Sequence, residues 1–128
     1  MNSLDTAEIH NIAALYGHVV DHQEWDQLDR IYTRQACYDG SGTSGARHEG
    51  LDAIRKFLIT VPHPIAHHTT NIHLEFAPQG VSATGRAKWL AIRPDMSITS
   101  GYYEDHWTKT NVGWRLCERA SFWVIPRP

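Results

Sequence analysis

The second half of the chain contains four long runs of alternating residues, which constrain the fold more than any other feature. The runs cover about residues 66–77, 81–93, 96–110 and 112–125. Short turn-forming segments separate them, with the sequences PQG, RPD and TNVG. Because such spacing is typical of hairpins, the sequence predicts a largely antiparallel sheet in which consecutive strands are neighbours.

The first half predicts helices instead. Residues 4–22 carry apolar side chains at helical spacing, residues 25–33 predict a second, short helix, and residues 51–61 predict a third that Pro62 ends. Between the last two lies the segment CYDGSGTSGARHEG, whose four glycines indicate a strand end, a loop and a turn. This order indicates an α+β fold, with three N-terminal helices packed on one face of a strongly curved, mostly antiparallel sheet. Such a sheet makes a cone-shaped α+β barrel with a hollow mouth, where pockets tend to form.

Length and composition narrow the class of protein. A chain of 128 residues predicts a single domain over residues 1–128. The net charge of −2 and the absence of a Lys/Arg run predict no nucleic-acid partner. No secretory signal and no apolar stretch of membrane-spanning length is visible, so we expect a cytoplasmic protein without a membrane partner. Cys37 and Cys117 are then expected to be buried free thiols.

Asp21 is the first candidate functional residue. It follows Val19 and Val20 at the edge of an apolar helix face, and Gly17, one turn earlier, leaves room above its carboxylate. Next to an apolar surface, the charged form of a carboxylate is destabilised by loss of water, unless a hydrogen-bond donor or a positive charge compensates. The alternative is a solvated residue at the end of the helix, or a cap for the helix that starts near Trp25.

His67 and His68 stand side by side at the start of the first predicted strand. Side chains alternate along a strand, so the two histidines face opposite ways. Regular alternation groups His68 with the apolar residues Ile72, Leu74 and Phe76, although a β-bulge would reset that count. A strand-end histidine can be merely structural, but a carboxylate that fixes its tautomer would make it a candidate base.

A metal site is the rival interpretation of the histidines. His67 and His73 are too far apart on a strand to share an ion, while His18 and His22 have the i, i+4 spacing of two ligands on one helix face. No matching second half of such a site is present, so we predict no metal. Nucleotide-binding and nucleophile-elbow motifs are also absent, and no cofactor is expected.

The third predicted strand alternates in a way that allows a pocket wall. One face carries Tyr103, Asp105 and Trp107, and the other carries Tyr102, Glu104 and His106. If the first set faces the hollow, it supplies a phenol, a carboxylate and an aromatic surface. The alternative is an aromatic stripe in a sheet interface.

Four motifs in order carry a resemblance to a known family. They are Y....D...W (Tyr16, Asp21, Trp25), HHTTN (His67 to Asn71), GYYED (Gly101 to Asp105) and GWRL (Gly113 to Leu116). Over about residues 4–125 the chain resembles the SnoaL-like cone-fold family. The similar branch contains scytalone dehydratase, hexachlorocyclohexane dehydrochlorinase and bile acid 7α-dehydratase.

The resemblance implies roles for individual residues. An Asp on the first helix orients a His on the sheet, and the His removes a proton from a substrate carbon; Asp21 and His67 match these two. Tyr16 matches a pocket tyrosine and Asp105 a pocket-facing polar residue. The family arginine near the C-terminus has no clear match, because Phe122 takes its place and Arg119 is offset. We therefore predict three catalytic residues, Asp21, His67 and Tyr16, and six substrate-binding residues: Tyr103, Asp105, Trp107, Trp25, His68 and Asn71.

The function that this resemblance implies is a cofactor-independent lyase, a dehydratase or related elimination enzyme, or an isomerase. Its substrate would be a hydrophobic cyclic small molecule, with the Asp–His dyad as general base. The alternative is a non-catalytic ligand-binding or subunit module, like the small subunit of ring-hydroxylating dioxygenases. The family fold also implies a homo-oligomer, a trimer or else a dimer.

Overall fold

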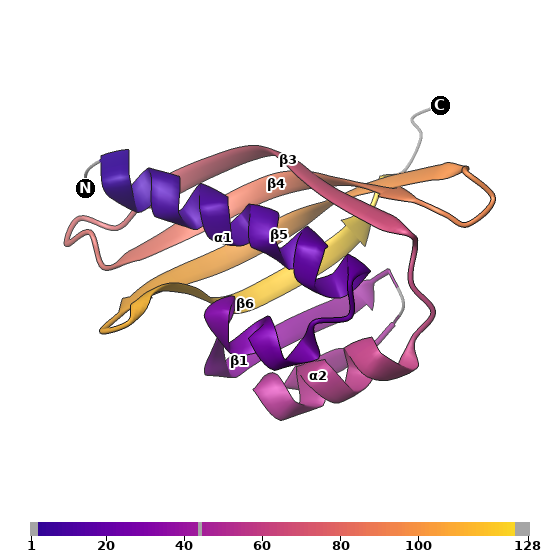
Figure 1. The fold of residues 1–128 in the computed structure, drawn as a ribbon. Coiled ribbons are helices and arrows are strands. Elements are labelled where there is room, and N and C mark those ends of the chain that lie inside the picture. Colours follow the sequence, from indigo (N-terminus) through magenta and orange to yellow (C-terminus); the bar gives the residue numbers. More distant parts are fainter. Residues whose placement is uncertain (1–2, 44, 125–128) are drawn as a thin grey trace.

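One six-stranded sheet forms the frame of the molecule, in the order β2-β1-β6-β5-β4-β3 (Figure 1). The structure is a computed structural model that describes residues 3–43 and 45–124. The helices are α1 (Ser3–Asp21), η1 (Trp25–Arg30, a 3-10 helix) and α2 (Leu51–Thr60). The strands are β1 (Tyr32–Gly42), β2 (Arg47–Glu49), β3 (Ala66–Phe76), β4 (Ser82–Ile92), β5 (Ile98–Thr110) and β6 (Gly113–Trp123).

The α+β prediction is confirmed, and β3 to β6 follow the four predicted runs closely. Their pairing is antiparallel, as the short turns require. The sheet is mixed rather than purely antiparallel, because β1 pairs in parallel with β6. It also stays open, since β2 and β3 are its two unpaired edges.

The prediction for residues 25–42 needs correction. The second helix ends at Arg30 instead of residue 33, and an eleven-residue strand, β1, begins at Tyr32. Ile31 and Tyr32 continue the helical spacing, but both side chains are buried in the core of the sheet. The short strand β2 lies within the predicted loop and pairs with β1. Tertiary pairing therefore overrides local pattern in this segment.

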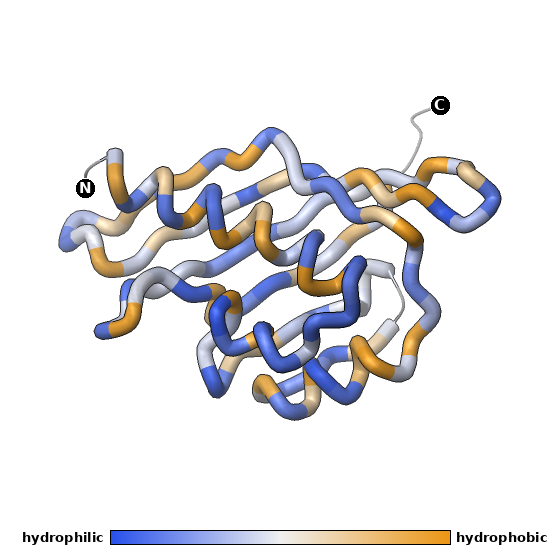
Figure 2. The backbone as a smooth tube through the Cα atoms, viewed as in Figure 1, coloured by the Kyte–Doolittle hydropathy of each residue, from blue (hydrophilic) through white to orange (hydrophobic). Residues whose placement is uncertain are grey.

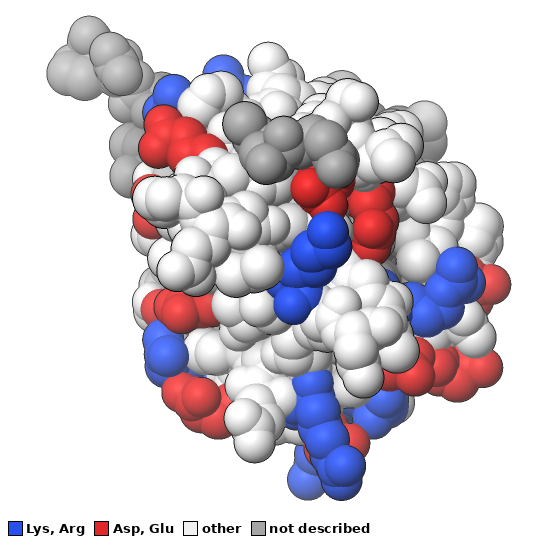
Figure 3. All heavy atoms as spheres, turned by 90° about the vertical axis from the view of Figure 1, so that its left-hand side faces the viewer, with Lys and Arg blue, Asp and Glu red and all other residues white. Residues whose placement is uncertain are grey.

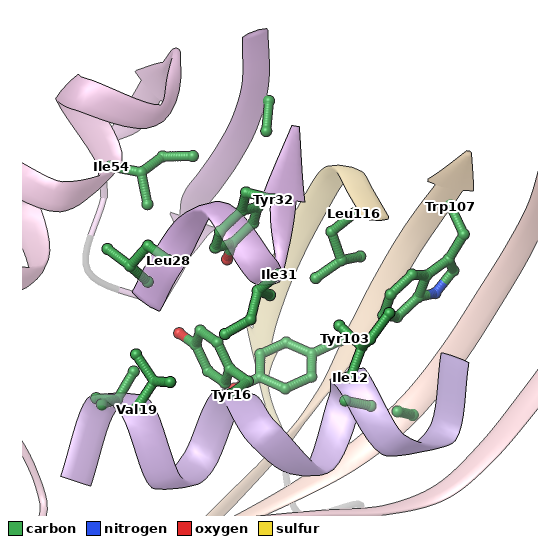
Figure 4. Close-up of a cluster of buried hydrophobic side chains, with 14 of the residues drawn as sticks. Ile12, Tyr16, Val19, Leu28, Ile31, Tyr32, Ile54, Tyr103, Trp107 and Leu116 are labelled. Atoms are coloured by element: carbon green, nitrogen blue, oxygen red, sulfur yellow. The ribbon is translucent and has the colours of Figure 1, made fainter. Parts of the chain in front are cut away.

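The helices cover one face of the sheet, here called the inner face. Figure 1 shows α1 lying across the curved sheet, and α1 packs on β3 and β6 while α2 packs on β1. The core lies between these layers, and Figure 4 shows Ile12, Tyr16 and Val19 of α1 pointing toward Tyr103 and the strands. In Figure 2, hydrophobic residues recur at intervals along α1 and the strands, interrupted by hydrophilic ones. Burial of this alternating apolar set is the main force that holds the two layers together.

Most charged side chains lie on the outside of this frame, while Asp5, Asp105 and Arg119 are buried. On the end of the molecule seen in Figure 3, Lys and Arg side chains are interspersed with Asp and Glu. Cys37 is buried, Cys117 is half-buried, and both are free thiols. Over residues 3–43 and 45–124, none of the helices combines the length and apolar character needed to cross a membrane.

A β-bulge divides β3 into two parts. Its pairing with β4 runs regularly up to Thr70↔Lys88 and resumes at His73↔Arg86, so two residues of β3 oppose the single residue Ala87. Asn71, within the bulge, has a φ of 53°, a left-handed conformation that asparagine adopts more readily than most residues. Odd-numbered residues face inward before the bulge and even-numbered ones after it.

Candidate active site

Asp21 is the last residue of α1, a position where the helix dipole disfavours a negative charge. Its carboxylate therefore needs hydrogen-bond donors, and His67 at the start of β3 supplies two. The ring nitrogen Nδ1 of His67 lies 2.5 Å from Oδ1 of Asp21, and the backbone N–H of His67 donates to Oδ2 at 3.0 Å. Both carboxylate oxygens are thus held by one residue 46 positions further along the chain.

This contact fixes the tautomer of His67. A carboxylate only accepts hydrogen bonds, so Nδ1 of the neutral ring must carry the hydrogen and Nε2 must keep its lone pair. The side chains of Asp21 and His67 are 17% and 15% exposed, which leaves the pair reachable but largely shielded from water. A neutral imidazole held in this way is equipped to accept a proton at Nε2.

Gly17 permits the close approach of α1 to β3. A Cβ atom at this position would lie 2.7 Å from the backbone oxygen of His67, closer than real Cβ contacts allow. The glycine therefore brings the end of the helix against the strand, so that Asp21 and His67 meet. The room that the sequence predicted above the carboxylate is filled by the backbone of β3.

His67 opens into a cavity of about 270 Å³ on the inner face. The walls come from α1, β1, α2, β4, β5 and β6, and six of the side chains are aromatic: Tyr16, Tyr38, Phe57, Trp89, Tyr103 and Trp123. Thr43, Thr99 and Ser121 add hydroxyl groups. The cavity is therefore largely apolar with a few polar groups, as is typical of small-molecule sites.

Two of the three cavity tyrosines, Tyr16 and Tyr103, lie edge to face. The ring centroids of Tyr16 and Tyr103 are 6.3 Å apart, with an interplanar angle of 87°. Burial raises the pKa of both phenols above the ordinary tyrosine value. Both hydroxyl groups therefore keep their hydrogens at neutral pH and can donate hydrogen bonds, but neither is suited to act as a base.

A larger hollow of about 930 Å³ lies on the opposite, outer face of the sheet. His73, Glu75, Arg86, Glu104 and His106 are among its lining residues, so it is strongly charged. Its described lining residues include neither Asp21 nor His67, the pair in which a carboxylate contacts a histidine ring nitrogen. We therefore assign the candidate active site to the smaller inner cavity.

Several predicted substrate-binding residues lie elsewhere. His68 is exposed, because it points away from the face that His67 occupies, and Asn71 lines the outer hollow because the bulge turns it outward. Trp25 packs its ring against His63 outside the cavity lining. Of the predicted site residues, the structure thus places Tyr16, His67 and Tyr103 in the cavity lining. Asp21 does not line the cavity itself but contacts His67, which does.

Asp105 and Trp107 face inward as their alternation predicts, yet neither lines the cavity. Trp107 is buried in the core further along β5 (Figure 4). Asp105 is 4% exposed and is engaged by the fully buried Arg119 of β6. Its carboxylate therefore binds an internal cation rather than facing the cavity.

His63 is a cavity residue that the sequence did not identify. It lies between Pro62 and Pro64, its ring is 6.1 Å from that of His67, and its Nε2 contacts the backbone oxygen of Leu58 at 2.5 Å. The two flanking prolines, which restrict the backbone on both sides, were the available signal.

The alternative metal interpretation depended on His18 and His22 of α1. His18 and His22 are both exposed, and their rings stack on each other at 6.1 Å. No group of three or more His, Cys, Asp or Glu side chains placed to hold a metal ion occurs in residues 3–43 and 45–124.

Similar solved structures share this fold. A candidate aromatic ring hydroxylase from Novosphingobium aromaticivorans is 24% identical, with 98% of this chain and 93% of that chain covered and a TM-score of 0.81. A candidate scytalone dehydratase from the same organism is 22% identical, with 95% and 85% covered and a TM-score of 0.80. LinA is 15% identical, with 95% and 85% covered and a TM-score of 0.75. At these identities the likeness establishes the fold alone.

Sequence comparison adds a family. No curated protein sequence matches the chain. A family model described as a SnoaL-like domain matches residues 1–120, which is nearly the whole chain.

Proposed function

Because the chain belongs to the SnoaL-like family, we propose that it is a cofactor-independent lyase or isomerase that acts on a hydrophobic cyclic small molecule. The observation that carries the proposal is the contact between Asp21 and Nδ1 of His67 at the mouth of an aromatic cavity. A fixed tautomer with a free Nε2 is the arrangement that a general base requires.

The proposed reaction begins at a carbon next to a substrate carbonyl. Nε2 of His67 removes a proton from that carbon. The electrons of the C–H bond form a C=C bond to the carbonyl carbon, and the π electrons of the C=O bond move onto the oxygen to give an enolate. Asp21 stabilises the imidazolium that forms. Tyr16 or Tyr103 donates a hydrogen bond to the enolate oxygen, where negative charge develops.

Two outcomes are open to the enolate. In an elimination, its electrons form a C=C bond while a hydroxyl group on the next carbon leaves, taking the proton from the His67 imidazolium and departing as water. In an isomerisation, the imidazolium returns the proton to a different carbon. Both sequences leave His67 neutral, so the enzyme is ready for another turnover.

The first step can be tested before the substrate is known. Cyclic ketones and β-hydroxyketones are incubated with the protein in D₂O, and deuterium incorporation next to the carbonyl is followed by NMR. The variant His67→Ala should lower the exchange rate by about 10²–10⁴-fold, the usual contribution of a general base. Asp21→Asn should also lower it by about 10²-fold or more, because the tautomer and the imidazolium lose their support.

His73→Ala is the matched control, because His73 is exposed on the outer face of the same strand. Its exchange rate should equal that of the wild-type protein. If His67→Ala and Asp21→Asn keep the full exchange rate, the dyad is not the catalytic machinery.

The second candidate is a non-catalytic ligand-binding or subunit module, which the likeness to the candidate aromatic ring hydroxylase supports.

We also propose a homo-oligomer, with a trimer favoured over a dimer by the dehydratase branch of the family. Light scattering of the purified protein tests both ideas, since one chain has a mass of 14.6 kDa. A lone monomer would contradict self-association, and purification only together with another protein would favour the module.

A further inference from the structure

Arg119 is a fully buried cation directly behind the cavity. It lies on β6 opposite Asp105 of β5, and the two are cross-strand partners on the inner face. Nε of Arg119 donates to Oδ1 of Asp105 at 2.8 Å, and Nη2 donates to Oδ2 at 2.9 Å. This paired geometry is the strongest form of an Arg–carboxylate contact and holds the guanidinium plane in one orientation.

The remaining nitrogen of Arg119, Nη1, is buried and has no hydrogen-bond partner among the described residues. The guanidinium lies against aromatic rings instead. Its central carbon is 3.7 Å from the ring centroid of Tyr103 and 4.8 Å from that of Tyr16, both within the range of a cation–π interaction. Figure 4 shows these two rings next to each other between α1 and the sheet.

The same two rings line the cavity that contains His67, whereas Arg119 does not. One aromatic layer therefore separates a permanent positive charge from any bound ligand. In a dry interior such a charge acts strongly over short distances.

The effect of this charge on the phenols has a definite sign. Burial is the main influence and raises the pKa of Tyr16 and Tyr103, while the charge of Arg119 lowers it. The Asp105 carboxylate acts in the opposite direction but more weakly on both phenols. Although Arg119 is paired, its charge therefore acts on both phenols more strongly than that of its partner Asp105.

We propose that Arg119 is a positioning residue that orients Tyr103 and Tyr16 and strengthens their hydroxyl groups as donors, so that the cavity prefers a ligand oxygen bearing negative charge. The ligand class would be cyclic ketones and phenols, whose oxygen becomes an enolate or phenolate. This inference rests on the proposed function only in placing the substrate oxygen in the same cavity.

The probe for the test is 4-nitrophenol, whose neutral and ionised forms differ in absorbance. Titration of the bound probe gives the ratio of the two affinities, and the wild-type protein should bind the phenolate more tightly than the neutral phenol. In the double variant Asp105→Leu/Arg119→Met, this preference should fall by about tenfold, which is one unit in the pKa of the bound probe. The affinity for the neutral phenol should stay within about twofold.

The double variant removes both charges together, since replacing only one would leave a buried charge without a partner. Arg119→Lys is the second variant: it retains the charge but loses the paired geometry. It should reduce the phenolate preference only in part, and partial rescue distinguishes an electrostatic role from simple packing. Ile54→Val, a buried change in α2 outside the cavity lining, controls for a general loss of core packing and should leave the preference unchanged.

An equal phenolate preference in wild-type protein and double variant would overturn the inference, as would a wild-type protein that binds no probe or shows no preference. The result is separable from the proposed function. If the phenolate preference depends on Arg119 but deuterium exchange does not depend on His67, the inference about Arg119 is supported and the proposed catalytic dyad is wrong. If exchange depends on His67 but the preference does not depend on Arg119, the dyad is supported and the inference about Arg119 is wrong.

Discussion

Two carboxylates of the described residues, Asp21 and Asp105, are each held by two hydrogen bonds from a single basic residue, and their surroundings differ sharply. Asp21 and His67 meet at the mouth of the cavity, with side chains 17% and 15% exposed. Asp105 and Arg119 lie in the core, 3% and 0% exposed. Both pairs join residues far apart in the sequence through two hydrogen bonds.

The difference shows that access and titration, rather than pairing itself, decide which pair can perform chemistry. Histidine changes its charge in the physiological range, whereas arginine is protonated at every pH that a protein meets. The pair at the mouth can therefore accept and release a proton. The core pair supplies a constant field and a fixed geometry, and its disruption should be felt mainly as a loss of stability.

The largest effect that would test this contrast is expected at the core pair. Arg119→Met leaves Asp105 buried without its partner, so the free energy of unfolding should fall by about 3–5 kcal/mol. Denaturation with urea measures the change. The double variant Asp105→Leu/Arg119→Met should recover most of it, and a loss of less than about 1 kcal/mol in the single variant would contradict a sealed core pair.

A smaller loss is expected where α1 touches β3. Gly17→Ala places a Cβ atom against the backbone oxygen of His67, and overpacking of this kind costs about 1–3 kcal/mol. The helix must shift, so the contact between Asp21 and His67 should lengthen and deuterium exchange should slow. Asn11→Ala, an exposed change in the same helix, is the control and should be neutral or stabilising. An equally stable and active Gly17→Ala protein would show that the close approach is not needed.

Alkaline pH should lower the free energy of unfolding through the buried phenol of Tyr32. Burial raises the pKa of Tyr32 well above its ordinary value, so the unfolded chain releases this proton near pH 10 while the folded chain retains it. Stability from this group is complete below pH 10 and is lost above it, at about 1.4 kcal/mol per pH unit.

Tyr32→Phe should therefore reduce the loss of stability between pH 10 and pH 11 by roughly 1 kcal/mol, without a comparable change in slope at pH 7. Urea denaturation at these pH values measures it. Tyr102→Phe, on the exposed outer face, is the matched control and should leave the alkaline slope as it is. An unchanged slope in Tyr32→Phe would show that the phenol ionises in the folded protein.

The smallest effect on stability is expected at the mouth pair. Asp21→Asn keeps an oxygen that can accept from the backbone N–H of His67, and it removes a negative charge that the helix end disfavours. The free energy of unfolding should fall by no more than about 1 kcal/mol. Denaturation and deuterium exchange are measured on the same preparation. A loss as large as that of Arg119→Met would erase the distinction between the two pairs.

The four C-terminal strands could be predicted because their turns are local. Only a few residues separate each strand from the next between β3 and β6, so a local turn motif predicts which strands pair. β1 pairs instead with β6, a strand far away in the chain, and its first residues continue the helical spacing of η1. No local pattern reports such a partner, so the sequence predicted only the end of this strand, in the segment that begins at Cys37.

The pair at the cavity mouth, Asp21 and His67, could be predicted in part from the sequence. Of the core pair, only Asp105 could be predicted to face inward, and its partner Arg119 could not be identified. A carboxylate at an apolar helix edge pointed to Asp21, but alternation alone could not decide between His67 and His68, because the bulge resets it. Asp105 faces inward as its alternation indicates. Its partner depends on the register between β5 and β6, which shifts between His106 and Trp107 and is not encoded in either strand alone.

The bulge in β3 also determines how this stretch of sequence can change in length. Deleting the codon for Asn71 would restore an unbroken alternation in which His67 still faces α1 and Ile72 still faces the core. Inserting one more codon there while a single bulge is retained would instead turn His68 toward Asp21. The doubled histidine therefore lets the gene gain or lose one codon at this point and still present an imidazole to the carboxylate.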